Sequence, residues 1–340
     1  MSYDADTIVD RRRMRRKLTV WRVLAVVLAI CAVVAIGAAI RAPGVGGLAG
    51  VTGGSIARVT INGLIRTDRQ RAEALERLGQ SQAKAVIVHI NSPGGTTSGS
   101  EELHDSLTRL RAQKPTVIVV DGLAASGGYI AALGGDHIVA QETSLVGSIG
   151  VLFQYPNFTE LLKTIGVSVE TIKSSPLKAA PSGYEPTSPE ARKAVEEIVL
   201  DSYAWFKALV QKRRNLDDAA LEKVADGRVF TGRQSLALNL VDQLGDERTA
   251  VDWLAKRYPC EPKASADAAK CIDPKTPIRD FRLRDRFGDL PFLHTAAVAT
   301  LDALGLGAFA RRIEDLGAMQ AIERLNLDGL LALWHPPSGN

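Results

Sequence analysis

The residues best suited to chemistry lie in a run of small side chains around one serine. Ser126 stands within Ala124–Gly128, soon after the continuous apolar run Pro115–Val120. That run has the length and β-branched composition of a buried strand, and Tyr129–Leu133 is typical of a helix start. A serine on a tight strand-to-helix turn exposes its hydroxyl, and the first N–H groups of the helix face any oxyanion formed beside it. The same pattern also fits a packing turn in which Ser126 only caps a helix.

A second glycine-rich loop, Asn91–Gly95, follows another apolar run, Ala85–Ile90. Two glycines after a proline let backbone N–H groups approach a ligand closely. Gly94 and Gly95 therefore suit one half of an oxyanion hole, with the N–H of Gly127 as the other half. Taken alone, the loop is more simply interpreted as an ordinary Pro-Gly turn.

A nucleophilic serine needs a base, and histidine is the first candidate. The chain has five histidines: His89, His104, His137, His294 and His335. A triad of Ser126, Asp136 and His137 is disfavoured, because adjacent residues of a strand point to opposite faces. Ala124 also stands where the G-x-S-x-G motif of other serine hydrolases has glycine.

A lysine is the alternative base, provided that burial disfavours its charged form near neutral pH. Lys178 lies in Ser174–Pro181, which is unusually apolar for a loop around a lysine, and Lys173 is its competitor. Ser148, within Gly147–Gly150, offers a hydroxyl that could orient the lysine amine. By composition alone, each lysine is typical of a solvated surface charge and Ser148 of a turn.

The elements that must position these residues alternate between strands and helices. Strands are predicted at 55–61, 85–90, 115–120, 137–140 and 167–172. Helices are predicted at 70–78, 100–111, 129–133, 221–225, 234–237 and 246–257. A long helix should begin at Ser188-Pro189 and bury Val195, Ile198, Trp205 and Leu209. This alternation predicts an α/β domain over 55–258.

The positive charge of the chain is concentrated at its N-terminus. The formal net charge is +4, and residues 1–22 hold seven Lys or Arg against three Asp, which leaves 35 basic and 35 acidic residues in the rest. The chain after residue 22 is therefore neutral, which argues against a nucleic-acid partner. Val23–Ile40 is an uncharged apolar run that can span a bilayer as one transmembrane helix. The basic residues should keep 1–22 cytoplasmic and place the rest on the exported side. A cleaved signal peptide is the alternative, disfavoured because the run is long for one.

The remaining segments flank the predicted domain. Residues 41–54 and 259–277 have linker composition, and 278–340 is predicted to be a C-terminal helical extension. Cys260 and Cys271 lie close together in the exported part, where an oxidising compartment favours a disulfide between them, although a free pair remains an alternative. Metal binding there is disfavoured because no histidine or third cysteine is nearby.

Four motifs in a fixed order give the chain a family resemblance. They are Asn91–Gly95, Ala125–Tyr129, Gly147–Gly150 and the Ile-Lys-Ser loop that leads to Lys178. With Ala225–Arg233, this set resembles signal peptide peptidase A, the protease IV family of membrane-anchored Ser/Lys peptidases. The resemblance covers 55–258 and the N-terminal anchor, and the chain length matches the short, single-domain form.

This resemblance implies a Clp-protease/crotonase-like fold and a set of roles for particular residues. It implies Ser126 as nucleophile, Lys178 as general base, Ser148 as the residue that holds the lysine amine, and Gly94, Gly95 and Gly127 as the oxyanion hole. It also implies remnant signal peptides as substrates, and a homo-oligomeric ring in which serine and lysine can come from neighbouring protomers. The chain departs from the family by having Lys173-Ser-Ser-Pro176 where Lys-Ser-Gly is usual.

The sequence therefore favours a membrane-anchored serine endopeptidase that needs no cofactor or metal. It has no G-x-x-x-x-G-K-[ST] loop, so ATP use is not expected. Two other classes remain open. One is a crotonase-like acyl-CoA hydratase or lyase on the same fold, and the other is a non-enzymatic membrane scaffold that uses its C-terminal helices for contacts.

Overall fold

The computed structural model describes residues 21–22, 54–260, 271–283 and the backbone of 330–333. The predicted anchor 23–40, nearly all of linker 41–54 and most of the C-terminal extension lie outside the described residues. Among the described residues, none forms a helix with both the length and the apolar character needed to cross a bilayer. The architecture below belongs to one compact unit, residues 50–340.

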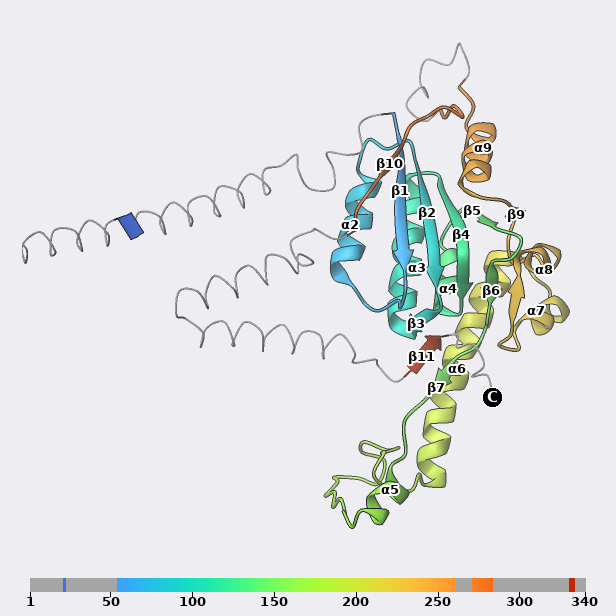
Figure 1. Ribbon diagram of the computed structural model, residues 1–340. Coiled ribbons are helices and arrows are strands. Elements are labelled where there is room, and N and C mark those ends of the chain that lie inside the picture. The colour runs from blue at the N-terminus through green and yellow to red at the C-terminus, as the bar shows by residue number, and fades with distance from the viewer. Residues whose placement is uncertain (1–20, 23–53, 261–270, 284–329, 334–340) are drawn as a thin grey trace, which may run out of the picture. The chain divides into compact units, whose positions relative to one another are not determined.

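The centre of this unit is a mainly parallel sheet (Figure 1). Its main path runs β10 (Ile278–Asp280), β1 (Ile56–Asn62), β2 (Ala85–Ser92), β4 (Thr116–Ala125), β5 (His137–Ala140) and β9 (Gln243–Leu244). Each pairing along the path is parallel. The outer part of β4 also pairs with β6 (Leu145–Gly147), which pairs antiparallel with β8 (Val229–Thr231). The strand order, with helices between strands, is the α/β arrangement that the sequence predicts.

A second, antiparallel sheet lies where β2 leads into the glycine loop. It has the order β3 (Gly94–Thr96), β11 (Leu330–Leu333) and β7 (Leu152–Phe153). β11 comes from the far end of the chain and lies between the two other strands (Figure 1). The sequence analysis did not predict any of these three short strands.

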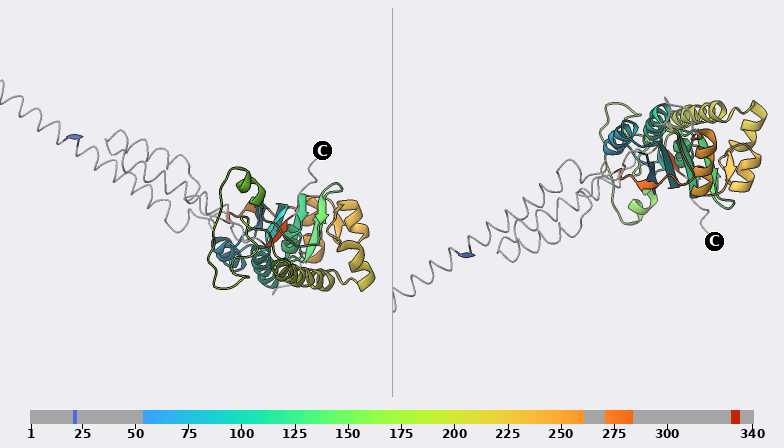
Figure 2. Two further views of the ribbon diagram at one scale, coloured as in Figure 1. Left: turned by 90° about the horizontal axis from the view of Figure 1, so that it is seen from below. Right: turned by 90° about the horizontal axis from the view of Figure 1, so that it is seen from above.

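Helices cover both faces of the main sheet. The helices of the described residues are α2 (Arg69–Gly79), α3 (Thr97–Gln113), α4 (Gly127–Ala132), α5 (Thr159–Thr164), α6 (Pro189–Arg214), α7 (Asp218–Val224), α8 (Gly232–Ala237) and α9 (Glu247–Arg257). Of these, α5 lies away from the main sheet. Figure 2 shows α6 and α9 on opposite sides of the sheet. The helices predicted within 55–258 are confirmed, whereas the described residues of the predicted C-terminal helical extension include the strands β10 and β11. Several helices begin as predicted from their caps; for example, the Ser188 hydroxyl accepts from the Ala191 N–H before Pro189 starts α6.

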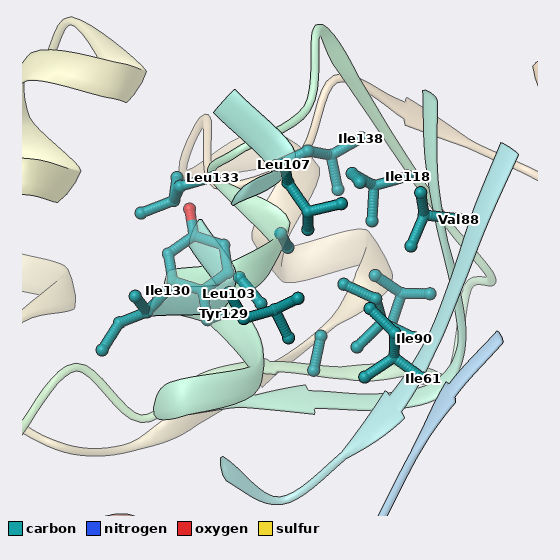
Figure 3. Packing of buried hydrophobic residues seen from close by; sticks show 14 of the residues in the cluster. Ile61, Val88, Ile90, Leu103, Leu107, Ile118, Tyr129, Ile130, Leu133 and Ile138 are labelled. Carbon is teal, nitrogen blue, oxygen red and sulfur yellow. The ribbon is translucent and has the colours of Figure 1, made fainter. Parts of the chain in front are cut away.

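The period-two alternation of the central strands separates two apolar cores. In β2, Val88 and Ile90 face the helices α3 and α4, whereas Ile87 faces α9. Figure 3 shows the first core, in which Leu107 of α3 and Tyr129 of α4 pack toward the sheet. Because strands of a parallel sheet are buried on both faces, they are continuously apolar. These apolar runs allowed the strands to be predicted from the sequence.

One prediction about the middle of the chain is wrong, and another is confirmed only in part. Residues 167–172 form no strand; Val167 and Val169 are half exposed and Ile172 is fully exposed. Apolar β-branched composition favours a strand only where a partner strand is available, and this segment pairs with none among the described residues. In α6, the predicted inward residues Trp205 and Leu209 pack against the core, whereas Ile198 is exposed. The fully buried large side chains of this helix are Phe206 and Val210.

The predicted disulfide between Cys260 and Cys271 is confirmed, with a Cα–Cα distance of 4.6 Å. It joins the chain after α9 to the segment that leads into β10. Beside it, the Ile272 N–H donates to the Tyr258 carbonyl at 2.8 Å, and Ile272 is buried under α9. The disulfide therefore secures the edge strand β10 to the domain.

A network of charged side chains connects β10, at the edge of the sheet, to the strands nearer its centre. Arg58 of β1 donates two hydrogen bonds to the Glu247 carboxylate of α9, at 2.5 and 2.7 Å, and one to Asp280 of β10 at 2.8 Å. A ring nitrogen of His89 lies 2.9 Å from the same Glu247 carboxylate, and the other lies 2.8 Å from Asp121. The hydrogen bond from Arg58 is the main cause that lowers the pKa of Glu247 below its usual value.

This lowered pKa predicts an acid-sensitive contribution to stability. Glu247 stabilises the fold above the pKa of an ordinary glutamate, and that stabilisation is lost as the pH falls through the lower, folded-state pKa. Glu247→Gln should therefore reduce the free energy of unfolding by about 1–2 kcal/mol at pH 7 and by much less at pH 3. Urea unfolding at both pH values measures this. Glu142→Gln, which breaks the exposed pair with Arg233, is the matched control and should change little at either pH. A Glu247→Gln penalty that is equal at pH 7 and pH 3 would contradict the assignment.

Candidate active site

Ser126 occupies the sharp turn between β4 and α4. Its backbone angles are φ 53° and ψ −115°, a conformation that residues with a side chain rarely adopt. Backbone strain of this kind concentrates at functional sites. A strained strand–turn–helix junction with serine at its apex is also the geometry that presents the nucleophile in α/β-hydrolases. The junction forms here although Ala124 replaces the glycine of their motif.

Backbone hydrogen bonds hold this turn in place. The Ser126 N–H donates to the Gly147 carbonyl at 2.7 Å, and the Ser126 carbonyl accepts from Tyr129 and Ile130 at 2.9 Å each. The hydroxyl Oγ lies 3.4 Å from the Gly150 carbonyl oxygen, a long contact, and the residue is 1% exposed. The nucleophile candidate thus has a fixed backbone and a weakly bound hydroxyl.

Glycines are required where the neighbouring loop touches this turn. A Cβ on Gly128 would lie 2.6 Å from the Ser92 carbonyl oxygen, so any side chain there would push α4 away from the end of β2. A Cβ on Gly95 would lie 1.7 Å from the Ile65 carbonyl oxygen. One glycine of each motif therefore serves close backbone approach, and the Gly128 contact places the Asn91–Gly95 loop against the start of α4.

The two candidate oxyanion donors of this loop face different partners. The Gly94 N–H already donates to Ser92 Oγ at 3.1 Å. Hydrogen bonds to Ile65 use the Gly94 carbonyl and the Thr96 N–H. Because N–H and C=O groups of successive strand residues alternate between the two sides, those of Gly95 face the opposite side, toward β11. In this arrangement the Gly94 N–H is therefore bonded within its own loop, and the Gly95 N–H faces a strand partner.

Ser148 lies in a second strained turn directly beside Ser126. Gly147, with φ 104°, accepts from the Ser126 N–H, and Ser148 itself has φ 51°. The Ser148 N–H donates to the Arg228 carbonyl at 2.8 Å, and Ser148 is 7% exposed. The structure thus brings together the turns that hold Ser126, Ser148 and the glycine loop.

The lysine loop lies apart from these turns within a single chain. Figure 1 shows the segment around α5 extending beyond β7 along the N-terminal half of α6, away from α4. Lys178 is exposed there, and Lys173 pairs with Glu185. A solvated lysine is charged at neutral pH and cannot act as a base, so Lys178 needs a covered environment to do so.

The histidines found in the described residues are placed elsewhere. His137 pairs with Val117 in the sheet register, nine residues before Ser126 along β4, or roughly 30 Å of extended chain. His137 stacks on Trp253 with ring centroids 4.5 Å apart. His104 contacts Asp105 on α3, and His89 is in the charged network described above. The disfavoured Asp136–His137 triad is therefore not formed.

The site also has features that the sequence analysis missed. The Gly150 carbonyl beside Ser126 Oγ and the strand β11 beside Gly95 were not predicted from the sequence.

In the described residues, no group of three or more His, Cys, Asp or Glu side chains is arranged to hold a metal ion.

Comparison with known proteins agrees with this geometry. The model of Peptidase family S49 matches residues 108–259, and that of Clp protease matches 67–144. A predicted protease of Synechocystis sp. is 37% identical over 227 residues, which cover 66% of this chain and 81% of that protein. A predicted signal peptide peptidase SppA of Enterococcus faecium is 36% identical over 184 residues, covering 54% of each chain. Protease 4 of Salmonella typhi is 34% identical over 211 residues, 59% of this chain and 34% of that protein.

A Clp-protease-like α/β fold with a serine at a strained strand-to-helix turn defines a serine peptidase. The matches to family models and relatives narrow that class. This chain belongs to peptidase family S49, and the predicted resemblance to the signal peptide peptidase A family is confirmed. The chain spans most of the Synechocystis relative but about half, or less, of the other two.

Proposed function

We propose that this chain is a membrane-anchored endopeptidase in which Ser126 and Lys178 form the catalytic dyad. The observation that carries the proposal is the Ser126 turn. A non-glycine residue at φ 53° is fixed between β4 and α4, and the close approach of Gly128 to Ser92 places the Asn91–Gly95 loop against the start of α4. Such a turn costs conformational energy, which a purely structural serine would have no reason to retain.

In the proposed reaction, Ser126 Oγ attacks the carbonyl carbon of a peptide bond while neutral Lys178 takes the hydroxyl proton. The N–H of Gly127 and an N–H of the Gly94–Gly95 loop stabilise the tetrahedral oxyanion. The protonated lysine then gives its proton to the leaving amine, which departs and leaves an acyl-enzyme. Water, deprotonated by the same lysine, hydrolyses the acyl-enzyme and restores Ser126. Ser148, beside the Ser126 turn, would hold the lysine amine in position.

The second catalytic residue is proposed to come from a neighbouring protomer in a homo-oligomeric ring. Lys178 is exposed in a segment that extends away from its own Ser126 (Figure 1). That segment also exposes several large apolar side chains: Phe158, Leu161, Ile165, Val167, Val169, Ile172, Leu177 and Tyr184. A concentration of exposed apolar residues marks an interaction surface. Burial of this surface against a second copy would supply the covered environment that a neutral lysine needs.

The substrate class and location follow from the sequence together with the family. The basic segment 1–22 and the apolar run 23–40 support a single-pass anchor in the cell membrane, with the catalytic domain on the exported side. The Cys260–Cys271 disulfide fits that side, because disulfides persist in oxidising compartments. A relative named signal peptide peptidase supports remnant signal peptides and other small apolar peptides as substrates.

The proposal predicts a single reactive serine. A fluorophosphonate probe should label the wild-type protein, and peptide mapping should locate the adduct on Ser126. Ser126→Ala should not be labelled, whereas the matched variant Ser144→Ala, at a buried serine whose hydroxyl donates to β4 carbonyls, should keep the label. A crotonase-like hydratase would use no nucleophilic serine, so an unlabelled wild type that hydrates an acyl-CoA would replace the peptidase proposal.

A further inference from the structure

The strand β4 has a bulge shortly before the turn that holds the candidate nucleophile. Two successive registers between β2 and β4 show it: Ile90 pairs with Val120, and Ser92 pairs with Ala124. Four positions of β4 therefore match two of β2, and the extra residues lie within 121–123. Near the same point β4 changes its other neighbour from β5 to β6. Bulges are over-represented next to active sites, because they change the direction of the residues that follow.

The side chain of His89, on β2, joins this bulge to the rest of the sheet. Its Nδ1 lies 2.8 and 3.1 Å from the two carboxylate oxygens of Asp121, which is in the bulge. Its Nε2 lies 2.9 Å from the Glu247 carboxylate of α9, which Arg58 of β1 also contacts. We call this arrangement, from Asp121 through His89 to Glu247, the His89 bridge.

The two ends of the His89 bridge require a particular form of the ring. Carboxylates only accept hydrogen bonds, so a neutral imidazole can donate to one of them, whereas the protonated ring donates to both. The His89 side chain is only 14% exposed. Charge interactions shielded from water in this way are screened little by salt. The bridge therefore restrains the bulge more firmly than an exposed surface pair would.

The two strands that the bridge joins lead to the two halves of the candidate site. β2 leads from His89 into the loop Asn91–Gly95, and β4 leads from the bulge to Ser126. The bulge also lies against the start of the loop, since a Cβ on Gly122 would be 3.4 Å from the side-chain oxygen of Asn91. Because the proposed oxyanion donors come from both halves, their spacing depends on how β4 lies against β2 at this point.

We propose that His89 is a positioning residue of the peptidase. By bridging Asp121 and Glu247, it holds the bulge of β4 against the end of β2, and it thereby sets the spacing between the Ser126 turn and the Asn91–Gly95 loop. This inference rests on the proposed function of Ser126, but the effect of the bridge on the bulge can be measured without catalysis.

The first test measures peptide hydrolysis by His89→Gln, well below its unfolding transition. Glutamine removes the charge and cannot bridge both carboxylates, so kcat should fall about tenfold while KM stays within about twofold. His89→Arg keeps a cation with donors for both carboxylates and should recover most of the lost kcat. The matched control is His137→Gln, at the histidine stacked on Trp253, and it should keep the wild-type kcat.

The double variant His89→Gln/Asp121→Asn should lose no more activity than His89→Gln, because both changes break the same bridge. A wild-type kcat in His89→Gln would overturn the inference, and so would His89→Arg with a kcat as low as that of His89→Gln. Should His89→Gln not fold, Asp121→Asn, at a partly exposed carboxylate, must show the same fall in kcat.

The second test measures amide hydrogen exchange in the catalytically inactive Ser126→Ala background. Adding His89→Gln should speed exchange of the segment 119–128 about tenfold, because local opening of the bulge becomes easier. Adding His137→Gln should leave that segment unchanged. Equal exchange with and without His89→Gln would contradict the bridge. Faster exchange, with no peptidase activity in the Ser126 protein, would retain the bridge and reject the nucleophile; peptidase activity with unchanged exchange would do the reverse.

Discussion

Ser126→Ala should abolish peptide cleavage, lowering kcat by at least about 10⁴-fold while the chain remains folded. The hydroxyl is the only group proposed to form the covalent acyl-enzyme, so no neighbour can replace it. Hydrolysis of a fluorogenic apolar peptide, followed at saturating substrate, measures the loss. Ser148→Ala is the informative comparison, because Ser148 is proposed to orient the lysine and should cost less, on the order of 10²-fold. Full activity in Ser126→Ala would end the proposal.

The same position allows a test that does not depend on activity. If the turn at φ 53° is strained for the sake of presenting the hydroxyl, Ser126→Gly should relieve that strain and raise the free energy of unfolding by about 1 kcal/mol. Ser126→Ala should not, because alanine has the same Cβ. If Ser126→Gly is more stable than the wild type and inactive, the strained turn lowers the stability of the fold while it positions the nucleophile. Equal stability of the Gly and Ala variants would mean that the turn is not strained.

The parts of the fold and site that depend on neighbouring residues in the chain could be predicted from the sequence. Continuous apolar strands such as β2 and β4 and the capped start of α6 have strong local signals, and each begins close to its predicted start, although β4 continues to Ala125. The small residues of 124–128 and 91–95 indicated close backbone approach, which the Gly95 and Gly128 contacts explain.

Structure that depends on contacts between residues far apart in the chain could not be predicted in the same way. β3, β7 and β11 are short strands whose existence depends on one another, and they unite parts of the chain more than 170 residues apart. The strand predicted at 167–172 is the opposite case. Its composition is typical of a strand, but no partner strand pairs with it within the described chain, and no strand forms. The positive-φ conformation of Ser126 was also not predicted, and one of the hydrogen bonds that hold it goes to Gly147 of another strand.

The proposed origin of the base in a neighbouring protomer makes a distinctive prediction. Lys178→Ala should lower kcat by about 10²–10⁴-fold, because it removes the only proposed proton acceptor. Lys173→Ala should cost far less, since Lys173 is already paired with Glu185. If the two catalytic residues come from different chains, co-assembly of Ser126→Ala with Lys178→Ala should restore activity. In a random ring, about a quarter of the sites would combine an intact Ser126 with a neighbour's intact Lys178.

The mixed assembly can be prepared by co-expressing two differently tagged chains and purifying through both tags. Each variant purified alone is the control and should remain inactive, as should a mixture of Ser126→Ala with the double variant Ser126→Ala/Lys178→Ala. Recovery near a quarter of wild-type kcat supports a composite site built from exposed Lys178 segments. No recovery in a stable mixed assembly would place both residues in one chain, which would require the segment around α5 to fold back toward its own α4. Wild-type activity in Lys178→Ala alone would instead assign the base to another residue.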